Sequence, residues 1–257
     1  MSLLFNACSD HQKMVKTRDY ETKYTYAKKM YETQKYSKAL PILEELIDAY
    51  RGTNKAENIY YMYAYTQYYY SKDYFVCAYY FSRFSTNFPT SKYAEECSYM
   101  SSYCYFLQSD DPDLDNTNTL AAINSFQIFV DKYPESKYVQ KCNENIDNLY
   151  KKIEIKNFNN AKLRYKIYDY KGAKILLRNF IRNNSMSLYN EEAQYLIVKS
   201  AFLLAEKSIE IKKLERYQET IDAANDYVAI YGSKKGQYLL EIERYLEKSK
   251  NRIEKSS

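Results

Sequence analysis

The chain has 257 residues, of which only four are glycine and four are proline while 46% are apolar, so it can form a core but has few residues suited to tight hairpin turns. This composition, rich in lysine, glutamate, leucine, alanine and tyrosine, favours helices. The net charge of +5 comes from 38 basic and 33 acidic residues that are mixed along most of the sequence, and this mixing argues against a nucleic-acid partner. The lack of a long apolar run argues against a membrane-spanning helix.

The chain opens with a short apolar stretch that ends at Cys8. A small residue, Ala7, directly before a cysteine is similar to a bacterial lipobox, in which the cysteine is acylated after the signal peptide is cleaved. Phe5 and Asn6 are atypical, and the stretch is shorter than the apolar core of a full signal peptide. The alternative is an ordinary start with an incidental cysteine. We interpret residues 1–18 as a lipobox remnant followed by a polar lipid tether.

The rest of the chain predicts helix pairs, because one pattern recurs along it five times. In the clearest copy, Tyr74 is followed by the small residue Cys77, then by Phe81 and Phe84 one and two helical turns later, and by Pro89. This order resembles the second helix of a tetratricopeptide repeat, in which a small residue sits where two helices touch and a proline ends the helix. The small residues of the five copies are Ala39, Cys77, Ala122, Ala173 and Thr220.

The first helix of each pair is predicted by its apolar stripe. Tyr61, Ala64, Tyr65 and Tyr68 follow the i, i+3, i+4, i+7 spacing of an amphipathic helix, and residues 93–108 and 195–205 do the same. A single helix pair cannot bury its apolar face alone, whereas stacked neighbours share a continuous core. We therefore predict an all-α fold, a superhelical stack of about five tetratricopeptide-like helix pairs.

An aspartate-rich segment, Ser109 to Asn118, interrupts the third copy of the pattern. Its carboxylates raise the question of calcium, but the spacing and the glycine of an EF-hand loop are missing. We interpret the segment as a polar connection between the two helices of the third repeat.

Residues for catalysis or metal binding are scarce. The only histidine, His11, lies in the expected tether, and no pair of cysteines has Cys-x-x-Cys spacing. We interpret Cys77, Cys97 and Cys104 as buried packing residues. A disulfide among them, and an enzyme that uses Cys97 or Cys104 as its nucleophile, are the alternatives. We expect no enzymatic activity, no metal site and no cofactor apart from a covalent lipid on Cys8.

Tyrosine is unusually frequent, with 33 residues, and several tyrosines fall on the predicted first helices. In a tetratricopeptide stack these helices line a concave groove, and the rigid ring of tyrosine buries contact area at low entropic cost. Such a groove would suit an extended peptide that ends in an aromatic residue. The alternative is that about half of these rings only pack against neighbouring helices. The inward positions are Tyr24, Tyr31, Met62, Tyr69, Tyr99 and Tyr103.

Several longer runs together resemble one family. Residues 38–47, Lys-Ala-Leu-Pro-Ile-Leu-Glu-Glu-Leu-Ile, are similar to the first repeat of BamD proteins from the Bacteroidota. BamD is the lipoprotein subunit of the outer-membrane β-barrel assembly (BAM) machine. The order of the repeats, the aspartate-rich insertion and the early cysteine make the resemblance specific over about residues 8–250. The other matching segments are residues 50–53, 88–91, 94–97, 115–119, 161–163, 165–171 and 212–217.

The resemblance implies a periplasmic body that is anchored to the outer membrane through acylated Cys8. It implies that repeats 1–3, residues 19–140, recognise the C-terminal peptide of unfolded outer-membrane barrel proteins. Repeats 4 and 5, residues 141–257, would dock on the POTRA domains of the BamA-type barrel subunit, alongside other BAM subunits. A different envelope adaptor that binds extended peptides stays open as an alternative, and nutrient-binding lipoproteins with such repeats are usually much longer.

Overall fold

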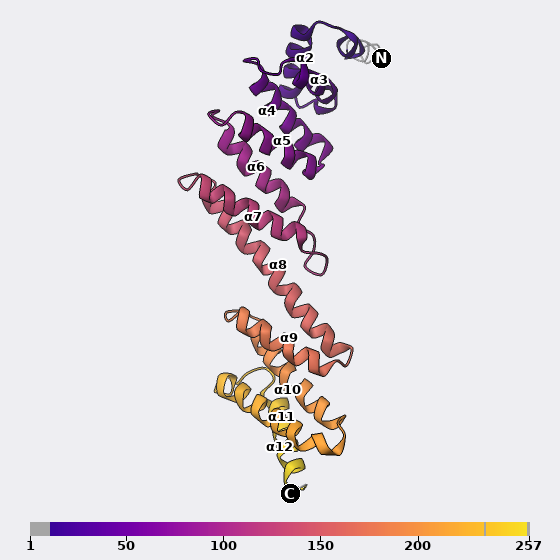
Figure 1. The fold of residues 1–257 in the computed structure, drawn as a ribbon, viewed down its shortest axis with the longest axis vertical. Helices are drawn as coiled ribbons and strands as arrows, with labels where there is room; N and C mark the ends of the chain where they lie inside the picture. The colour runs from indigo at the N-terminus through magenta and orange to yellow at the C-terminus, as the bar shows by residue number, and fades with distance from the viewer. Residues whose placement is uncertain (1–10, 234, 256–257) are drawn as a thin grey trace. The chain divides into compact units, whose positions relative to one another are not determined.

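The computed structural model describes residues 11–233 and 235–255, and in this part of the chain the regular secondary structure is entirely helical, which confirms the all-α prediction. Figure 1 shows the helices in chain order. They are α2 (Tyr20–Glu32), α3 (Tyr36–Ala49), α4 (Ala56–Thr66), the π-helix η1 (Gln67–Ser71), α5 (Tyr74–Asn87), α6 (Ala94–Leu107), α7 (Thr117–Lys132), α8 (Val139–Lys166), α9 (Tyr170–Asn183), α10 (Asn190–Glu206), α11 (Glu210–Tyr231) and α12 (Leu239–Glu254).

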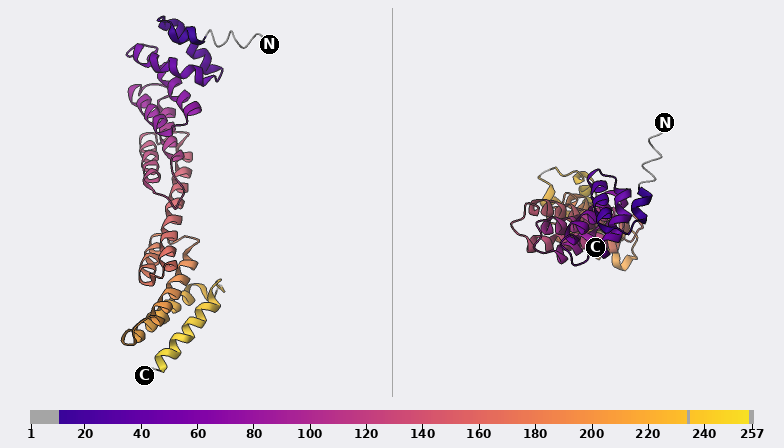
Figure 2. Two further views of the ribbon diagram at one scale, coloured as in Figure 1. Left: turned by 90° about the vertical axis from the view of Figure 1, so that its right-hand side faces the viewer. Right: turned by 90° about the horizontal axis from the view of Figure 1, so that it is seen from above.

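The helices form two compact units, Met1–Tyr150 and Lys151–Ser257, and the division falls within α8. In the first unit α2 packs on α3, α4 on α5 and α6 on α7, and each pair also contacts the next one. In the second unit α9 packs on α10 and α10 on α11, and α12, drawn in yellow in Figure 2, lies beside α11. Helices that are consecutive in the chain are thus neighbours in space, as a tetratricopeptide stack requires.

The small residues that the repeat pattern places between helices are all buried. A small side chain at this position lets the backbones of two helices approach closely while the interior stays close-packed. Thr220, the one polar member, donates its hydroxyl to the carbonyl oxygen of Arg216 at 2.9 Å. The repeat frame predicted from the sequence is therefore confirmed by residues that are each 0% exposed, namely Ala39, Cys77, Ala122, Ala173 and Thr220.

A left-handed residue followed by an aspartate closes the turn inside two of the helix pairs. Lys72 has a φ of 54°, and the next residue, Asp73, accepts a hydrogen bond from the first turn of α5 at 3.2 Å. Tyr168 has a φ of 67°, and Asp169 accepts a hydrogen bond from the backbone of Gly172 in α9 at 2.9 Å. The positive φ reverses the chain within a few residues, and the carboxylate satisfies an N–H group that has no partner inside the helix.

A recurring arrangement, which we call the repeat joint, holds the turn after a second helix against the first helix of the same pair at four places along the chain. A glutamate near the start of a first helix, and an aromatic residue one turn later, both contact the turn that follows the second helix. Glu95 accepts a hydrogen bond from Ser136 Oγ at 2.6 Å, and Tyr99 stacks on Tyr138 with ring centroids 4.4 Å apart. Equivalent ring pairs, 4.1 to 4.8 Å apart, are Tyr61–Tyr93, Phe158–Tyr189 and Tyr195–Tyr238.

Replacing Ser136 with alanine is expected to lower the free energy of unfolding of the first unit by about 1–2 kcal/mol. The hydroxyl of Ser136 donates to Glu95 and accepts from the backbone N–H of Tyr138, so the substitution leaves a carboxylate and an N–H group without these partners. Chemical denaturation followed by circular dichroism measures the loss. Ser82→Ala, at an exposed position in α5, is the matched control. Equal stability of the two variants would contradict a role for the joint.

The N-terminal stretch assigned to the tether is partly folded. Residues 11–16 are helical, the ring nitrogen Nδ1 of His11 lies 3.2 Å from the hydroxyl of Tyr26, and Met14 packs against the core of the first repeat. The predicted lipidation site, Cys8, lies outside the described residues. Among the described helices, none combines the length with the apolar character that crossing a bilayer demands.

The aspartate-rich segment connects α6 to α7, as predicted. Asp115 accepts a hydrogen bond from the backbone N–H of Thr117 at 2.8 Å, at the first residue of α7, and Asp110 accepts one from the side chain of Asn118 at 3.4 Å. These carboxylates therefore help to close the connection and to start the helix. Among the described residues, histidine, cysteine, aspartate and glutamate side chains form no group that could hold a metal ion.

Candidate functional site

On the first unit, four tyrosines from different helices meet, namely Tyr31, Tyr36, Tyr65 and Tyr69. We call these four residues the tyrosine cluster. Tyr69 lies between two other rings, stacked on Tyr36 at a centroid distance of 5.2 Å and on Tyr65 at 5.8 Å. Tyr31 meets Tyr36 edge-on at 6.0 Å. Tyr69 is nevertheless 48% exposed, so the cluster presents ring surface to solvent. Preordered rings of this kind can bury the surface of a partner with little further loss of freedom.

The π-helix η1 at the end of α4 positions the outer ring of the cluster. Its sequence, Gln-Tyr-Tyr-Tyr-Ser, ends at the left-handed residue Lys72. Tyr68 turns towards the core, with its centroid 6.3 Å from Phe81 and 6.0 Å from Tyr74, whereas Tyr69 stacks on Tyr36. A π-turn within an α-helical element is uncommon and frequently occurs at functional sites. The local helix geometry thus separates an inward tyrosine from an exposed one.

Glu96 of α6 holds the inner side of the cluster. It accepts hydrogen bonds from the hydroxyl groups of Tyr65 and Tyr61, the latter at 3.1 Å. Burial raises the pKa of Tyr65 far above its ordinary value, and the hydrogen bond to Glu96 adds to the shift. Burial, followed by the neighbouring tyrosines, likewise raises the pKa of Tyr31. Both phenols therefore stay protonated at neutral pH and remain hydrogen-bond donors.

Three of the six predicted groove residues fall on or next to this surface. Tyr31 and Tyr69 belong to the tyrosine cluster itself. Tyr103 of α6 is half-buried and stacks on Phe106 at 5.8 Å. Its ring also stacks on Tyr99 at 6.0 Å, and after burial Tyr103 makes the largest contribution to the raised pKa of the inward-facing Tyr68. The structure therefore places Tyr31 and Tyr69 in the tyrosine cluster and Tyr103 in a separate ring stack on α6.

The other three predicted groove residues lie elsewhere. Tyr24 accepts a hydrogen bond from the side chain of Asn58 at 2.7 Å, and the ammonium group of Lys55 lies 4.9 Å from its ring. Met62 is 2% exposed in the core of the first two repeats, and Tyr99 is 9% exposed because it is stacked in a repeat joint. The packing alternative considered above therefore describes Met62 and Tyr99, which a peptide cannot reach without opening the core.

Three residues of this surface were not singled out by sequence reasoning. Tyr36 was identified only as the start of a second helix and Tyr65 only as part of an apolar stripe, while Glu96 has the appearance of an ordinary helix-surface acid. The sequence nevertheless contained a signal for this surface, because the three consecutive tyrosines at residues 68–70 cannot all lie on the core face of a regular α-helix. Such a run at the end of a predicted helix indicates a local change of geometry.

The four cysteines of the described chain are packed inside it. Cys77, Cys97, Cys104 and Cys142 are free thiols and each is 0% exposed. Burial raises the pKa of Cys97 well above its ordinary value and that of Cys142 to about 11. The hydrogen bond with Cys77, followed by burial, raises the pKa of Cys104. Since the thiolate is the reactive form, the structure argues against the hypothesis of a nucleophile at Cys97 or Cys104.

Thiol labelling of the native protein is expected to leave these four cysteines unmodified on the timescale in which denatured protein reacts completely. The reason is that all four sulfurs are buried and that the raised pKa values of Cys97, Cys104 and Cys142 keep these thiols protonated. Peptide mapping by mass spectrometry assigns the label to each cysteine, with guanidine-denatured protein as the positive control. Rapid native labelling of Cys97 or Cys104 would contradict the packing role.

Comparison with known proteins agrees with this architecture. A family model described as YfiO, outer membrane lipoprotein, matches residues 17–163, which is more than half of the chain. The match includes the tyrosine cluster, η1, the aspartate-rich connection and most of α8. No curated protein matches the chain. The YfiO model is the domain of the BamD family, which confirms the resemblance seen in the sequence. The chain belongs to the YfiO family of outer membrane lipoproteins.

Proposed function

We propose that this protein is the lipoprotein scaffold of an outer-membrane β-barrel assembly complex, anchored on the periplasmic face through acylated Cys8. It acts by binding other proteins rather than by catalysis, and it helps to recognise and insert unfolded outer-membrane barrel proteins. Membership of an outer membrane lipoprotein family supports a location in the cell envelope. The exposed tyrosine cluster is the observation that carries the binding part of the proposal.

The tyrosine cluster is suited to the C-terminal peptide of an unfolded barrel protein. Such a peptide is extended and often ends in an aromatic residue. Aromatic pairs with stacked or edge-on geometry contribute about 0.5–1.5 kcal/mol beyond the area they bury. The exposed ring of Tyr69, already held between Tyr36 and Tyr65, offers such a contact without prior rearrangement. We assign this recognition to repeats 1–3.

Docking on the POTRA domains of a BamA-type barrel subunit is assigned to repeats 4 and 5. The turn between α9 and α10 supports this, because Met186 and Leu188 are 93% and 98% exposed. They line a pocket of about 360 Å³ together with Ile155 of α8. Apolar side chains exposed to this degree and gathered in one patch are typical of protein–protein interfaces.

Purification of the native complex tests the proposal. The wild-type chain is expected to recover the barrel-forming subunit, whereas the double variant Met186→Glu/Leu188→Glu should recover it about fivefold less, because two charges would be buried against an apolar partner. Leu240→Glu, at an 80% exposed position in α12, is the matched control. Absence of the barrel-forming subunit from the wild-type complex would instead favour the alternative, another envelope adaptor that binds extended peptides.

Mass spectrometry of the native N-terminus tests the anchor. We expect a mature chain that begins at Cys8 and carries covalent acyl groups, since stable anchoring requires more than one chain. Cys8→Ser should release the protein from the membrane fraction. An unmodified Cys8 in membrane-bound protein would refute lipidation at this residue and leave the peptide-binding proposal to be tested separately.

A further inference from the structure

The fourth repeat carries a concentration of positive charge that the overall composition conceals. Residues 155–183 contain eight basic side chains and a single acid, Asp169, for a net charge of +7 against +5 for the whole chain. The rest of the chain is therefore net negative. Lys162 and Lys174 are paired with glutamates, but other cations of this segment are exposed and form no ion pair within the described chain, namely Lys166, Lys171 and Arg178.

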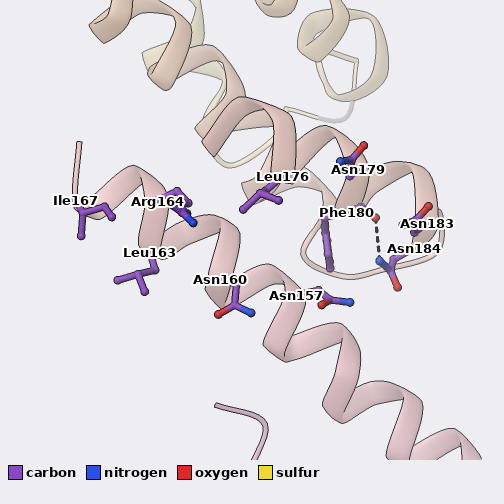
Figure 3. A pocket seen from close by; sticks show the side chains of 10 residues that line it. All are labelled: Asn157, Asn160, Leu163, Arg164, Ile167, Leu176, Asn179, Phe180, Asn183 and Asn184. Carbon is purple, nitrogen blue, oxygen red and sulfur yellow. Dashed lines mark hydrogen bonds between the residues drawn. The ribbon is translucent and has the colours of Figure 1, made fainter. Parts of the chain in front are cut away.

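A groove of about 750 Å³ lies in this basic segment, between the C-terminal half of α8 and α9 (Figure 3). All of its lining residues belong to the second unit, and none of them is acidic. Figure 3 shows Ile167, Leu163 and Leu176 towards one end of the groove and, together with the ring of Phe180, most of the asparagines towards the other. The lining is thus divided into an apolar half and an amide half.

Asparagine dominates the polar half of the groove. Asn184 donates to the carbonyl oxygen of Phe180 at 2.9 Å, and Asn179 accepts from Arg182 at 3.2 Å, so each keeps part of its amide unused. The side-chain amides of the other asparagines in the lining form no hydrogen bond within the described chain. Each amide offers two donors and one acceptor oxygen. The groove therefore presents both donors and acceptors, from Asn157, Asn160, Asn179, Asn183 and Asn184.

The apolar half of the groove leaves large side chains in solvent. Leu163 is 52% exposed, Ile167 55% and Leu176 37%. In Figure 3 Arg164 lies at the apolar end of the groove, between Ile167 and Leu176, and its side chain is 54% exposed. Within the described residues its one ion pair is a 3.4 Å contact with Asp169, a carboxylate that also caps α9. A long contact between two exposed groups is worth little, so the guanidinium is free to bind an anion.

These features favour an extended peptide over a helix as the ligand. In a helix the backbone N–H and C=O groups are bonded internally, so asparagine amides would find few partners. An extended chain exposes a backbone donor and acceptor at each residue, and its side chains alternate between two faces. One face can place apolar residues on Leu163 and Ile167, and a carboxylate can reach Arg164.

We propose that the α8–α9 groove binds an extended acidic peptide segment, with the asparagines contacting its backbone, the leucines and isoleucine its apolar side chains and Arg164 a carboxylate. The site lies in the second unit and does not depend on the tyrosine cluster. Nor does it use Met186 and Leu188, which line a different pocket.

The probe is a fluorescein-labelled nine-residue peptide that alternates valine with glutamate, measured by fluorescence anisotropy on the full chain. We expect micromolar binding that weakens about tenfold in Arg164→Gln and about threefold or more in Asn157→Ala/Asn160→Ala. Matched controls are Lys166→Gln, an exposed cation on α8 outside the groove lining, and Asn225→Ala, an exposed asparagine on α11. Both should retain wild-type affinity within about twofold.

Five comparisons decide the outcome. The lysine version of the peptide should fail to bind, and Tyr69→Ala/Tyr103→Ala should leave binding of the acidic peptide unchanged, which separates this site from the tyrosine cluster. Equal losses in Arg164→Gln and Lys166→Gln would overturn the proposal in favour of diffuse charge attraction. Equal binding of an alanine-rich helical peptide with the same glutamates, or of phosphatidylglycerol vesicles, would also overturn it.

Discussion

Replacing Phe81 with alanine is expected to destabilise the first unit by about 3–5 kcal/mol. Phe81 of α5 is 0% exposed, and its ring meets Tyr65 edge-on at a centroid distance of 4.9 Å. Removing the ring leaves a cavity that neighbouring helices cannot fill, and it also takes away support from the tyrosine cluster. Phe126 of α7, also 0% exposed, occupies the equivalent position of the third repeat and is expected to behave alike.

Phe75→Ala provides the matched control, because Phe75 belongs to the same helix and is 60% exposed. This variant should change the free energy of unfolding by less than about 1 kcal/mol. Urea denaturation followed by circular dichroism measures both variants, with the transition of the first unit fitted separately since the chain has two compact units. Similar stabilities for Phe81→Ala and Phe75→Ala would contradict the repeat packing described above.

The double variant Tyr69→Ala/Tyr103→Ala is expected to weaken capture of a barrel C-terminal peptide by about thirtyfold, or 2 kcal/mol. Both rings are accessible in part, so their loss removes contact area from the binding surface without emptying the core. Anisotropy of a labelled peptide that ends in phenylalanine measures the affinity. Circular dichroism of the same samples establishes that the helical content is unchanged.

Tyr79→Ala is the control for this experiment, because Tyr79 is 55% exposed on α5, outside the tyrosine cluster. It should bind the peptide as the wild type does. If the double variant retains full affinity with its fold intact, the tyrosine cluster is not the peptide-binding surface. If Tyr79→Ala loses as much affinity as the double variant, binding depends on tyrosine content rather than on this arrangement.

Much of the fold followed from local sequence pattern. The helix expected over residues 93–108 is observed as α6, Ala94–Leu107, and the polar connection expected after it joins α6 to α7. These features are local, because the period of a helix and the residues that begin or end it lie within a few positions of one another. The same holds for the small residue of each second helix, whose surroundings repeat from one copy to the next.

The candidate sites could be predicted from the sequence only in part, because the apolar, rigid ring of a tyrosine suits a protein core and a binding surface equally well. The α8–α9 groove escaped notice for a related reason. Arg164 and the asparagines spread over residues 157–184 become one lining only when α8 and α9 lie side by side. A count of basic residues along the whole chain averages this segment with acidic ones and hides its excess.

Local pattern was therefore enough for the repeat frame, the helix pairs and the assignment to a family, since each rests on the spacing of neighbouring residues. The accessibility of each tyrosine depended on contacts between segments far apart in the chain. Tyr99 is covered because the turn at Ser136 folds back and stacks Tyr138 on it, whereas the π-turn of η1 leaves Tyr69 half in solvent against Tyr36. The exposure of a tyrosine thus depends on which distant segments pack against it.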